Sequence, residues 1–146
     1  MEKIKIKKLS SRATIPTRAT DGSAGYDLYT TIHGDTVLKS GESRKFPTGI
    51  AIEIDNSSIA GFVYARSGIA AKYGVAPANC VGIIDSDYRG EIMVTLHNHS
   101  QYDFKITPNM RIAQLVFAPV ILPEFELAEE LKKTERQDGG FGSTGI

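Results

Sequence analysis

Short apolar segments with a two-residue period recur along most of this chain, and turn-forming residues separate them. Isoleucine occupies every second position of residues 50–54, which is the period of a strand with one buried face. Similar alternation, or a short continuous apolar run, is found at residues 4–9, 62–65, 92–97, 102–106, 112–116 and 125–131. Dipeptides typical of turns, such as Asp21-Gly22 and Thr107-Pro108, lie between these segments. We therefore expect a strand at each of them.

Only Ser67–Tyr73 is typical of an internal helix, with Ser67 as the expected N-cap and Gly74 as the residue that ends it. Many short strands with one short helix predict an all-β sandwich or barrel. A length of 146 residues suits one domain.

Charge and cysteine content exclude several classes of protein. Basic and acidic residues number 17 each, so the basic excess of a broad nucleic-acid binder is missing. The single cysteine, Cys80, permits neither an intrachain disulfide nor a cysteine metal cluster, and we expect it to be an inert residue in a strand. The N-terminus lacks the apolar region of a secretory signal, and no segment is long enough to span a membrane. We expect a cytoplasmic protein that binds neither nucleic acid nor membrane.

Three internal segments carry polar residues that could form a binding site. Arg66-Ser67-Gly68 at the expected helix start offers a charge, a hydroxyl and free backbone N–H groups for a phosphate, although the segment taken alone is better explained as a plain helix cap with a surface arginine. Residues 79–91 read as a hairpin whose tip carries Asp85 and Tyr88, suited to acid–base chemistry or to a solvated turn. Arg111 and Gln114 differ in parity along one strand, so we expect them on opposite faces of the sheet.

The C-terminus is rich in glycine from residue 139 onward, with one aromatic, Phe141, among the glycines. Such a sequence holds no stable element alone. Both a lid that closes over a ligand and an unstructured tail fit this composition.

Taken together, five segments resemble the five ordered motifs of the trimeric dUTPase family. They are residues 24–28 (Ala-Gly-Tyr-Asp-Leu), 64–68 (Tyr-Ala-Arg-Ser-Gly), 82–90 (Gly-Ile-Ile-Asp-Ser-Asp-Tyr-Arg-Gly), 111–115 (Arg-Ile-Ala-Gln-Leu) and 136–145, where Arg136 precedes the glycine-rich end. Each motif alone is weak, but all five in this order are specific. Ile83, where the family more often has valine, is a conservative departure.

The resemblance implies a jelly-roll-like β-sandwich or barrel with one short helix, assembled as a homotrimer with a site at each interface. It implies hydrolysis of dUTP to dUMP and pyrophosphate, which limits uracil in DNA and supplies dUMP for thymidylate synthesis. It also implies a β domain at residues 1–133 and a flexible arm at 134–146 that closes over the site.

The resemblance further implies a role for each matching residue. Asp85 would activate the attacking water, and Tyr88 would pack under the deoxyribose. The uracil would be read by Asn79 and by the segment of Gly82, Ile83 and Ile84, with Met93 lining the same pocket. The phosphates would contact Arg66, Ser67, Gly68 and Gln114, and the arm would contribute Arg136, Phe141, Gly142, Ser143 and Thr144. Mg²⁺ would be held mainly through the substrate phosphates, with Asp27 as a candidate contact through water.

Three other functions are weighed against this one. A dCTP deaminase-like relative would need a glutamate-centred site and should lack the arm with Phe141. A non-catalytic regulatory protein on the same scaffold would not need Asp85, Tyr88 and Arg136 intact. A β-sandwich adhesion domain would not need polar motifs within its strands.

Overall fold

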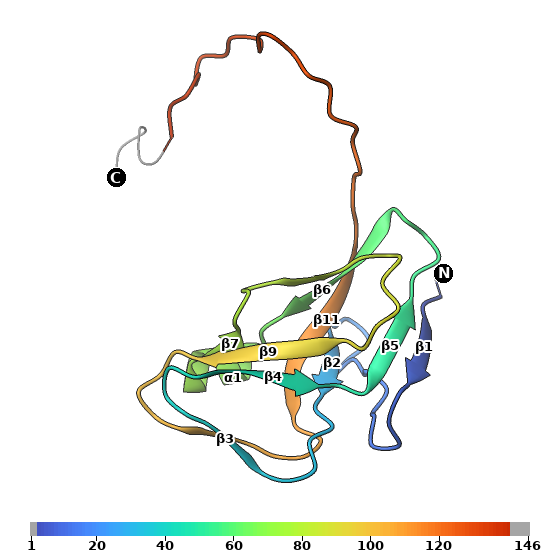
Figure 1. Cartoon of the computed structure of the whole chain (residues 1–146), viewed down its shortest axis with the longest axis vertical. Helices are drawn as coiled ribbons and strands as arrows, with labels where there is room; N and C mark the ends of the chain where they lie inside the picture. The colour runs from blue at the N-terminus through green and yellow to red at the C-terminus, as the bar shows by residue number, and fades with distance from the viewer. Residues whose placement is uncertain (1–2, 141–146) are drawn as a thin grey trace.

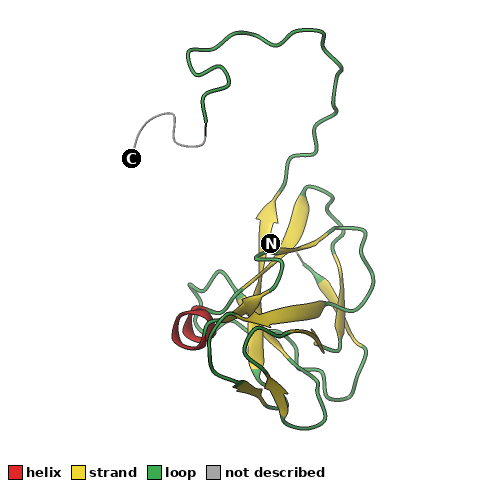
Figure 2. Cartoon of the chain, turned by 60° about the vertical axis from the view of Figure 1, so that its left-hand side comes forward, coloured by secondary structure: helices red, strands yellow, loops and turns green. Residues whose placement is uncertain are grey.

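Eleven strands, all paired antiparallel, form the body of residues 3–140, the part of the chain that this computed structural model describes (Figure 1). The strands are β1 (Lys5–Lys8), β2 (Tyr26–Tyr29), β3 (Thr36–Leu38), β4 (Ser43–Pro47), β5 (Ile50–Glu53), β6 (Ile59–Tyr64), β7 (Val75–Pro77), β8 (Gly82–Ile84), β9 (Met93–Asn98), β10 (Phe104–Ile106) and β11 (Arg111–Pro119). The helix α1 (Ser67–Tyr73) lies at one side of the strand-built body (Figure 2). The predicted all-β fold with one short helix is confirmed.

Two larger sheets and two strand pairs organise the body. The four-stranded sheet has the order β2-β11-β6-β8, and the three-stranded sheet has the order β4-β9-β7. Strands β1 and β5 form one pair, and β3 and β10 form the other. β2 and β8 are the outer strands of the larger sheet, so each has one edge without a neighbouring strand in the described chain. The outer edge of β2 carries a single bridge, between Asp27 and Thr17.

The core collects the inward faces of these strands. In β9, Val94 and Leu96 are almost fully buried while Met93 and Thr95 face outward, as the sequence period predicts. The largest side chains with less than 2% exposure are those of Phe46, Leu28, Leu38, Ile50, Ile92, Leu96, Ile106, Ile112 and Leu115. Burial of each stabilises the fold by about 1.5–3 kcal/mol.

The helix has the predicted bounds, but its N-cap differs from the prediction. Arg66 rather than Ser67 is the N-cap, with extended backbone and no side-chain capping bond. The carbonyl of Arg66 accepts hydrogen bonds from the backbone N–H groups of Ile69 and Ala70, so Ser67 already belongs to the first turn. Gly74 ends the helix at φ 66°, and its N–H donates to the carbonyl of Ala70 at 3.0 Å, as predicted.

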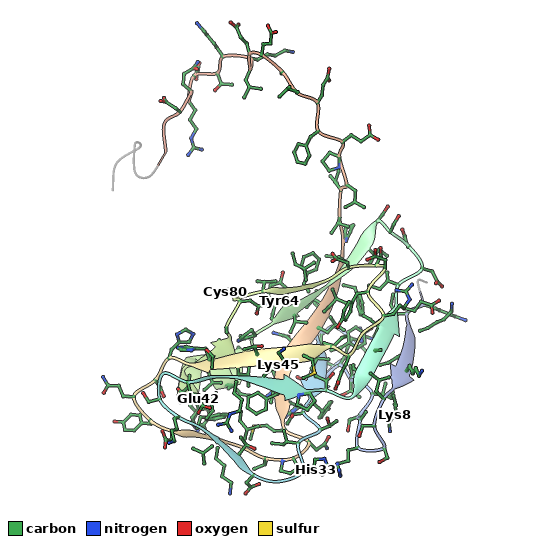
Figure 3. All side chains as sticks on the ribbon, viewed as in Figure 1. Lys8, His33, Glu42, Lys45, Tyr64 and Cys80 are labelled. Carbon is green, nitrogen blue, oxygen red and sulfur yellow. The ribbon has the colours of Figure 1, made fainter. Side chains whose placement is uncertain are left out.

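The segment after β7 departs from the predicted simple hairpin. β7 pairs with β9, while β8 between them pairs with β6. Cys80, predicted in a strand, is exposed in the turn between β7 and β8 at φ 62° (Figure 3). The reason is that the chain turns after Pro77, with the N–H of Cys80 donating to the carbonyl of Pro77 at 3.0 Å.

The strand predicted at residues 125–131 is not formed. Beyond β11 the chain leaves the body as an extended segment without strand or helix up to residue 140 (Figures 1 and 3). Phe125 and Leu127 are fully exposed. The alternation of apolar residues is present, but a strand also needs a neighbouring strand to bond with, and none lies beside this segment.

None of the helices in residues 3–140 combines the length and apolar character that crossing a membrane requires.

Candidate functional site

A cavity of about 440 Å³ opens between β6, β8 and β9. Its lining residues are Val63, Pro77, Ala78, Asn79, Gly82, Ile83, Ile84, Met93, Val94 and Thr95. Five of the residues assigned from the sequence to reading a base, Asn79, Gly82, Ile83, Ile84 and Met93, therefore lie together. We call this the first cavity.

The loop after β7 builds one wall of the first cavity. The N–H of Ala78 donates to the carbonyl of Thr95 at 2.8 Å, which ties the loop to β9. A Cβ on Gly82 would lie 3.3 Å from the Cβ of Val63 and 3.3 Å from Nδ2 of Asn79. Glycine at this position thus lets β8 approach β6 closely and leaves the amide of Asn79 at the cavity wall. Apolar walls with one side-chain amide and an exposed strand edge suit a flat, uncharged, hydrogen-bonding ring.

A cavity of about 460 Å³ lies between β2, β11 and the start of α1. Its lining residues are Ala19, Ser23, Ala24, Gly25, Asp27, Arg66, Ser67, Gly68, Arg111, Gln114 and Val116. It gathers every residue of the described chain that the sequence assigns to phosphate except Arg136. We call this the second cavity, and it shares no lining residue with the first.

The second cavity is held by one carboxylate and two guanidinium groups. Oδ1 of Asp27 accepts from Nε of Arg66 at 2.7 Å, and Oδ2 accepts from Nη1 of Arg111 at 3.0 Å. Nη1 of Arg66 also donates to the carbonyl of Arg111 at 3.3 Å. The side chain of Asp27 is only 13% exposed. The excess of positive charge in a partly buried hollow suits an anion such as a phosphate.

The prediction that Arg111 and Gln114 face opposite sides of the sheet is wrong. The register of β11 against β2 shifts between Arg111 and Ala113, and Ile112 and Ala113 are both buried in succession. A β-bulge of this kind adds one residue and reverses the alternation of faces. Arg111 and Gln114 therefore line the same cavity.

Gly25 is a residue whose part in the site the sequence did not indicate. Nε2 of Gln114 donates to the carbonyl of Ala65 at 2.8 Å. A Cβ on Gly25 would lie 2.3 Å from Oε1 of Gln114, so any larger residue would displace this amide. The sequence contains this glycine in the first motif, but its contact with Gln114 is visible only in the packing of the structure.

Asp85 and Tyr88 lie on the exposed turn after β8 and line neither cavity. The N–H of Tyr88 donates to the carbonyl of Asp85 at 3.1 Å, which closes the turn. Nη1 of Arg89 donates to the carbonyl of Ser86 at 2.7 Å and braces it. Asp85 directly follows Ile84, a lining residue of the first cavity, and is itself exposed.

Arg136 lies on the extended C-terminal segment, away from both cavities, where its Nε donates to the carbonyl of Gly139 at 2.8 Å. The arm residues Phe141, Gly142, Ser143 and Thr144 lie outside the described residues. Among residues 3–140, no group of three or more His, Cys, Asp or Glu side chains is placed to hold a metal ion.

Comparison with known proteins identifies relatives along the whole chain. The family model described as dUTPase matches residues 11–145. A deoxyuridine 5′-triphosphate nucleotidohydrolase of Desulfitobacterium hafniense is 46% identical over 150 residues, covering 100% of this chain and 99% of that protein. The protein of the same name from Serratia proteamaculans is 46% identical, covering 99% of this chain and 98% of that one.

Two solved structures share the fold. The dUTPase of Staphylococcus bacteriophage 80alpha with dUpNHpp has a TM-score of 0.89 at 26% identity, covering 100% of both chains. A dUTPase variant of phage phi11 of S. aureus, described as coordinating a structural Mg(II) ion, has a TM-score of 0.78 at 25% identity, covering 88% of this chain and 97% of that one. The jelly-roll-like fold implied by the sequence resemblance is thereby confirmed. This chain belongs to the dUTPase family.

Proposed function

We propose that this chain hydrolyses dUTP to dUMP and pyrophosphate by attack of water on the α-phosphorus. The observation that carries the proposal is full-length identity of 46% to a deoxyuridine 5′-triphosphate nucleotidohydrolase. The two cavities support it, because one is apolar with a single side-chain amide and the other is cationic. A nucleoside triphosphate has the matching halves, an uncharged base and an anionic chain.

The first cavity is proposed to bind the uracil. β8 is an outer strand of its sheet, so part of its backbone N–H and C=O groups have no ladder partner in the described chain. Together with the amide of Asn79, these groups can pair with the donor and acceptor edge of uracil. The fixed groups would mispair with cytosine, and an unpaired buried polar group costs about 1–3 kcal/mol. A close fit of the base against this loop would leave no space for the methyl group of thymine.

The second cavity is proposed to bind the phosphates through Arg66, Ser67, Gly68 and Gln114. Asp27 is its one carboxylate, which fits Mg²⁺ held mainly by phosphate oxygens with few protein ligands. When bound, Mg²⁺ would neutralise the charge that develops on the leaving pyrophosphate. Asp27 remains a candidate contact to the ion through water.

Asp85 is proposed as the general base. Asp85 is exposed and directly follows Ile84 of the first cavity, so its carboxylate can accept a proton from a water molecule there. Positioning that water beside the α-phosphorus supplies the nucleophile. Tyr88 on the same turn is proposed to pack under the deoxyribose, where a ribose 2′-OH would clash.

The separation of the two cavities supports a site assembled from several copies of the chain. The two cavities share no lining residue and Arg136 lines neither, which fits a nucleotide bound between copies of the chain. We propose a homotrimer in which the first cavity of one subunit faces the second cavity of a neighbour.

An apolar groove supports the same assembly. This groove of about 430 Å³ is lined by Ile4, Ile6, Ile15, Pro16, Ala24, Tyr26, Ile52, Ile59, Leu115 and Phe117. The extended segment beyond β11 carries Ile121, Leu122, Phe125, Leu127 and Leu131, each at least 72% exposed. Exposed apolar side chains of this number mark a contact with another molecule. We propose that the segment of one subunit covers the groove of the next.

Residues 134–146 are proposed as an arm that closes over the bound nucleotide, and residues 1–133 as the β domain. Within this arm Arg136 and the residues from Phe141 to Thr144 would contact the base and the terminal phosphate. Closure of such a segment excludes bulk water from the site while the attacking water stays beside the phosphorus.

The direct test is incubation of the chain with dUTP, dCTP, dTTP or UTP and Mg²⁺, followed by assays for pyrophosphate and ammonia. We expect pyrophosphate from dUTP alone. Ammonia from dCTP would identify a deaminase instead, and no release from any nucleotide would identify a non-catalytic relative. The Asp85→Asn variant should bind dUTP without turnover, and full activity of that variant would remove Asp85 from the mechanism.

A further inference from the structure

The ring of Tyr88 lies against the backbone of Gly90. A Cβ at Gly90 would lie 2.4 Å from Oη, 2.6 Å from Cζ and 3.0 Å from Cε2 of Tyr88. Real Cβ atoms do not approach other heavy atoms below 3.0 Å. Any side chain at residue 90 therefore forces the tyrosine ring to move.

Space, and not backbone conformation, is what requires glycine at this position. Among the described glycines, positive φ is found at Gly41, Gly49 and Gly74, and Gly90 is not one of them. Alanine can adopt the backbone of residue 90 without strain. The three closest atoms that a Cβ at residue 90 would meet all belong to Tyr88, so the contact with Tyr88 is the first that Gly90→Ala disturbs.

The ring is also held from its far end. Oη of Tyr88 donates to the carbonyl of Glu91 at 2.9 Å. Glu91 is in turn fixed, because Oε1 of its carboxylate accepts from the N–H of Gly49 at 2.7 Å. The next residue, Ile92, is fully buried, and its N–H donates to the carbonyl of Ile50 at 2.9 Å. The end of the loop that carries the tyrosine contact is thus anchored to the core.

Tyr88 itself remains 43% exposed. A ring displaced from Gly90 can swing into solvent, so its displacement costs the fold little. A change at residue 90 can therefore move the ring of Tyr88 without a large loss in the free energy of unfolding.

We infer that Gly90 is a positioning residue that sets the selection of deoxyribose over ribose, by leaving the space in which Tyr88 lies flat against the loop. The inference rests on the proposed function, in which Tyr88 packs under the sugar. A ring pushed away from Gly90 no longer presents the surface that excludes a 2′-OH, so discrimination falls while the fold is kept.

The experiment compares kcat/KM for dUTP and for UTP in the wild type and in Gly90→Ala. We expect the ratio of the two values to fall by about tenfold or more, as expected for the loss of a packing contact that selects a substrate. Gly34→Ala is the matched control, because a Cβ at Gly34 meets no atom within 4 Å, and its ratio should equal that of the wild type. Tyr88→Phe, which removes only the hydroxyl bond to Glu91, should lower the ratio less.

A second comparison shows whether Gly90 acts through Tyr88. In the Tyr88→Ala background, Gly90→Ala should cause no further loss of discrimination. Nuclear Overhauser contacts between the Tyr88 ring protons and the Gly90 α-protons should be strong in the wild type without any nucleotide. Their absence would overturn the inference independently of activity.

Two results would overturn the inference while the proposed function stands. One is a folded Gly90→Ala variant whose ratio of kcat/KM for dUTP to kcat/KM for UTP equals that of the wild type. The other is a further fall of this ratio when Gly90→Ala is added to Tyr88→Ala. A wild type that fails to hydrolyse dUTP overturns the proposed function itself.

Discussion

Asp27 accepts a hydrogen bond from Nε of Arg66 at 2.7 Å, across 39 residues of sequence. The bond fixes the guanidinium group at the second cavity, and Arg111 on the other carboxylate oxygen completes the arrangement at 3.0 Å. The Asp27 carboxylate thus positions two arginine side chains at the second cavity, whether or not Asp27 itself contacts a ligand.

Asp27→Asn should therefore weaken substrate binding by loosening both arginines. We expect kcat/KM for dUTP to fall by about tenfold, the effect of losing about 1.4 kcal/mol of charge-assisted bonding. Asp35→Asn is the control, since Asp35 and Lys105 form a surface ion pair with side chains 52% and 61% exposed, worth about 0–1 kcal/mol. A rise in the Mg²⁺ concentration needed for half-maximal rate, with unchanged dUTP affinity, would instead assign Asp27 to the water shell of the ion.

Gly25→Ala should displace Gln114 and lower turnover. Its Cβ would meet Oε1 of Gln114 at 2.3 Å and Cδ at 3.1 Å, and the bond from Nε2 of Gln114 to Ala65 would be lost. If Gly25 acts only through this contact, the double variant with Gln114→Ala should be no slower than Gln114→Ala alone. Steady-state rates of the four proteins check this, and additive losses would show a separate role for Gly25.

Asn98→Ala should be among the most destabilising single changes outside the cavities. Asn98 is fully buried, and its Nδ2 donates to the carbonyls of Leu38 and Tyr102 at 3.0 and 2.8 Å. Its Oδ1 accepts from both the N–H and the hydroxyl of Ser100. We expect the free energy of unfolding to fall by about 3 kcal/mol, because several buried groups lose their partners. Urea denaturation at fixed protein concentration checks this, with the exposed Gln101→Ala as the control.

Glu42 should make part of the stability depend on acid pH. The N–H of Lys39 and the guanidinium group of Arg44 donate to its carboxylate and hold its pKa below the ordinary 4.5. A lowered pKa means that this stabilisation is present above the unfolded pKa and is lost as pH falls below about 4.5 through the folded pKa. Glu42→Gln should therefore show a flatter decline of unfolding free energy in this range. Parallel curves for the two proteins would contradict the assignment.

Local features were predictable from the sequence wherever neighbouring residues decide them. The helix bounds follow from the residues of Ser67–Tyr73 and from Gly74, and the buried face of β9 follows from the alternation of Ile92, Val94 and Leu96. The bulge beside Arg111 was not predictable, because it depends on how β11 registers against β2. The pairing of β8 with β6 likewise depends on tertiary contacts and not on its own residues.

Part of each cavity could be predicted from the resemblance to the family, but the division of these residues between two cavities could not. Asn79 and Met93 meet because β7 and β9 pair, and Arg66 and Gln114 meet because β6 and β11 pair. The motifs alone do not indicate that these two groups of residues line different cavities of one chain. Only the packing shows that Asp85 and Tyr88 stand outside both.

The extended segment beyond β11 supplies the sharpest test of assembly. Phe125 and Leu127 alternate with Glu124 and Glu126, whereas β1 alternates Ile6 with Lys5 and Lys7. A segment laid beside the free edge of β1 would place its apolar side chains over the groove and its carboxylates near the lysines.

Phe125→Asp combined with Leu127→Asp should therefore convert the proposed trimer into smaller species and abolish dUTP turnover. Both side chains are fully exposed in the single chain, so their replacement costs the isolated fold nothing and acts only on association. Glu126→Gln, at the intervening position, is the control and should leave the trimer intact. Light scattering coupled to size-exclusion chromatography measures the mass of each protein. An intact, active trimer of the double aspartate variant would show that the groove is covered by something other than this segment, and an active monomer of the wild type would refute a site shared between subunits.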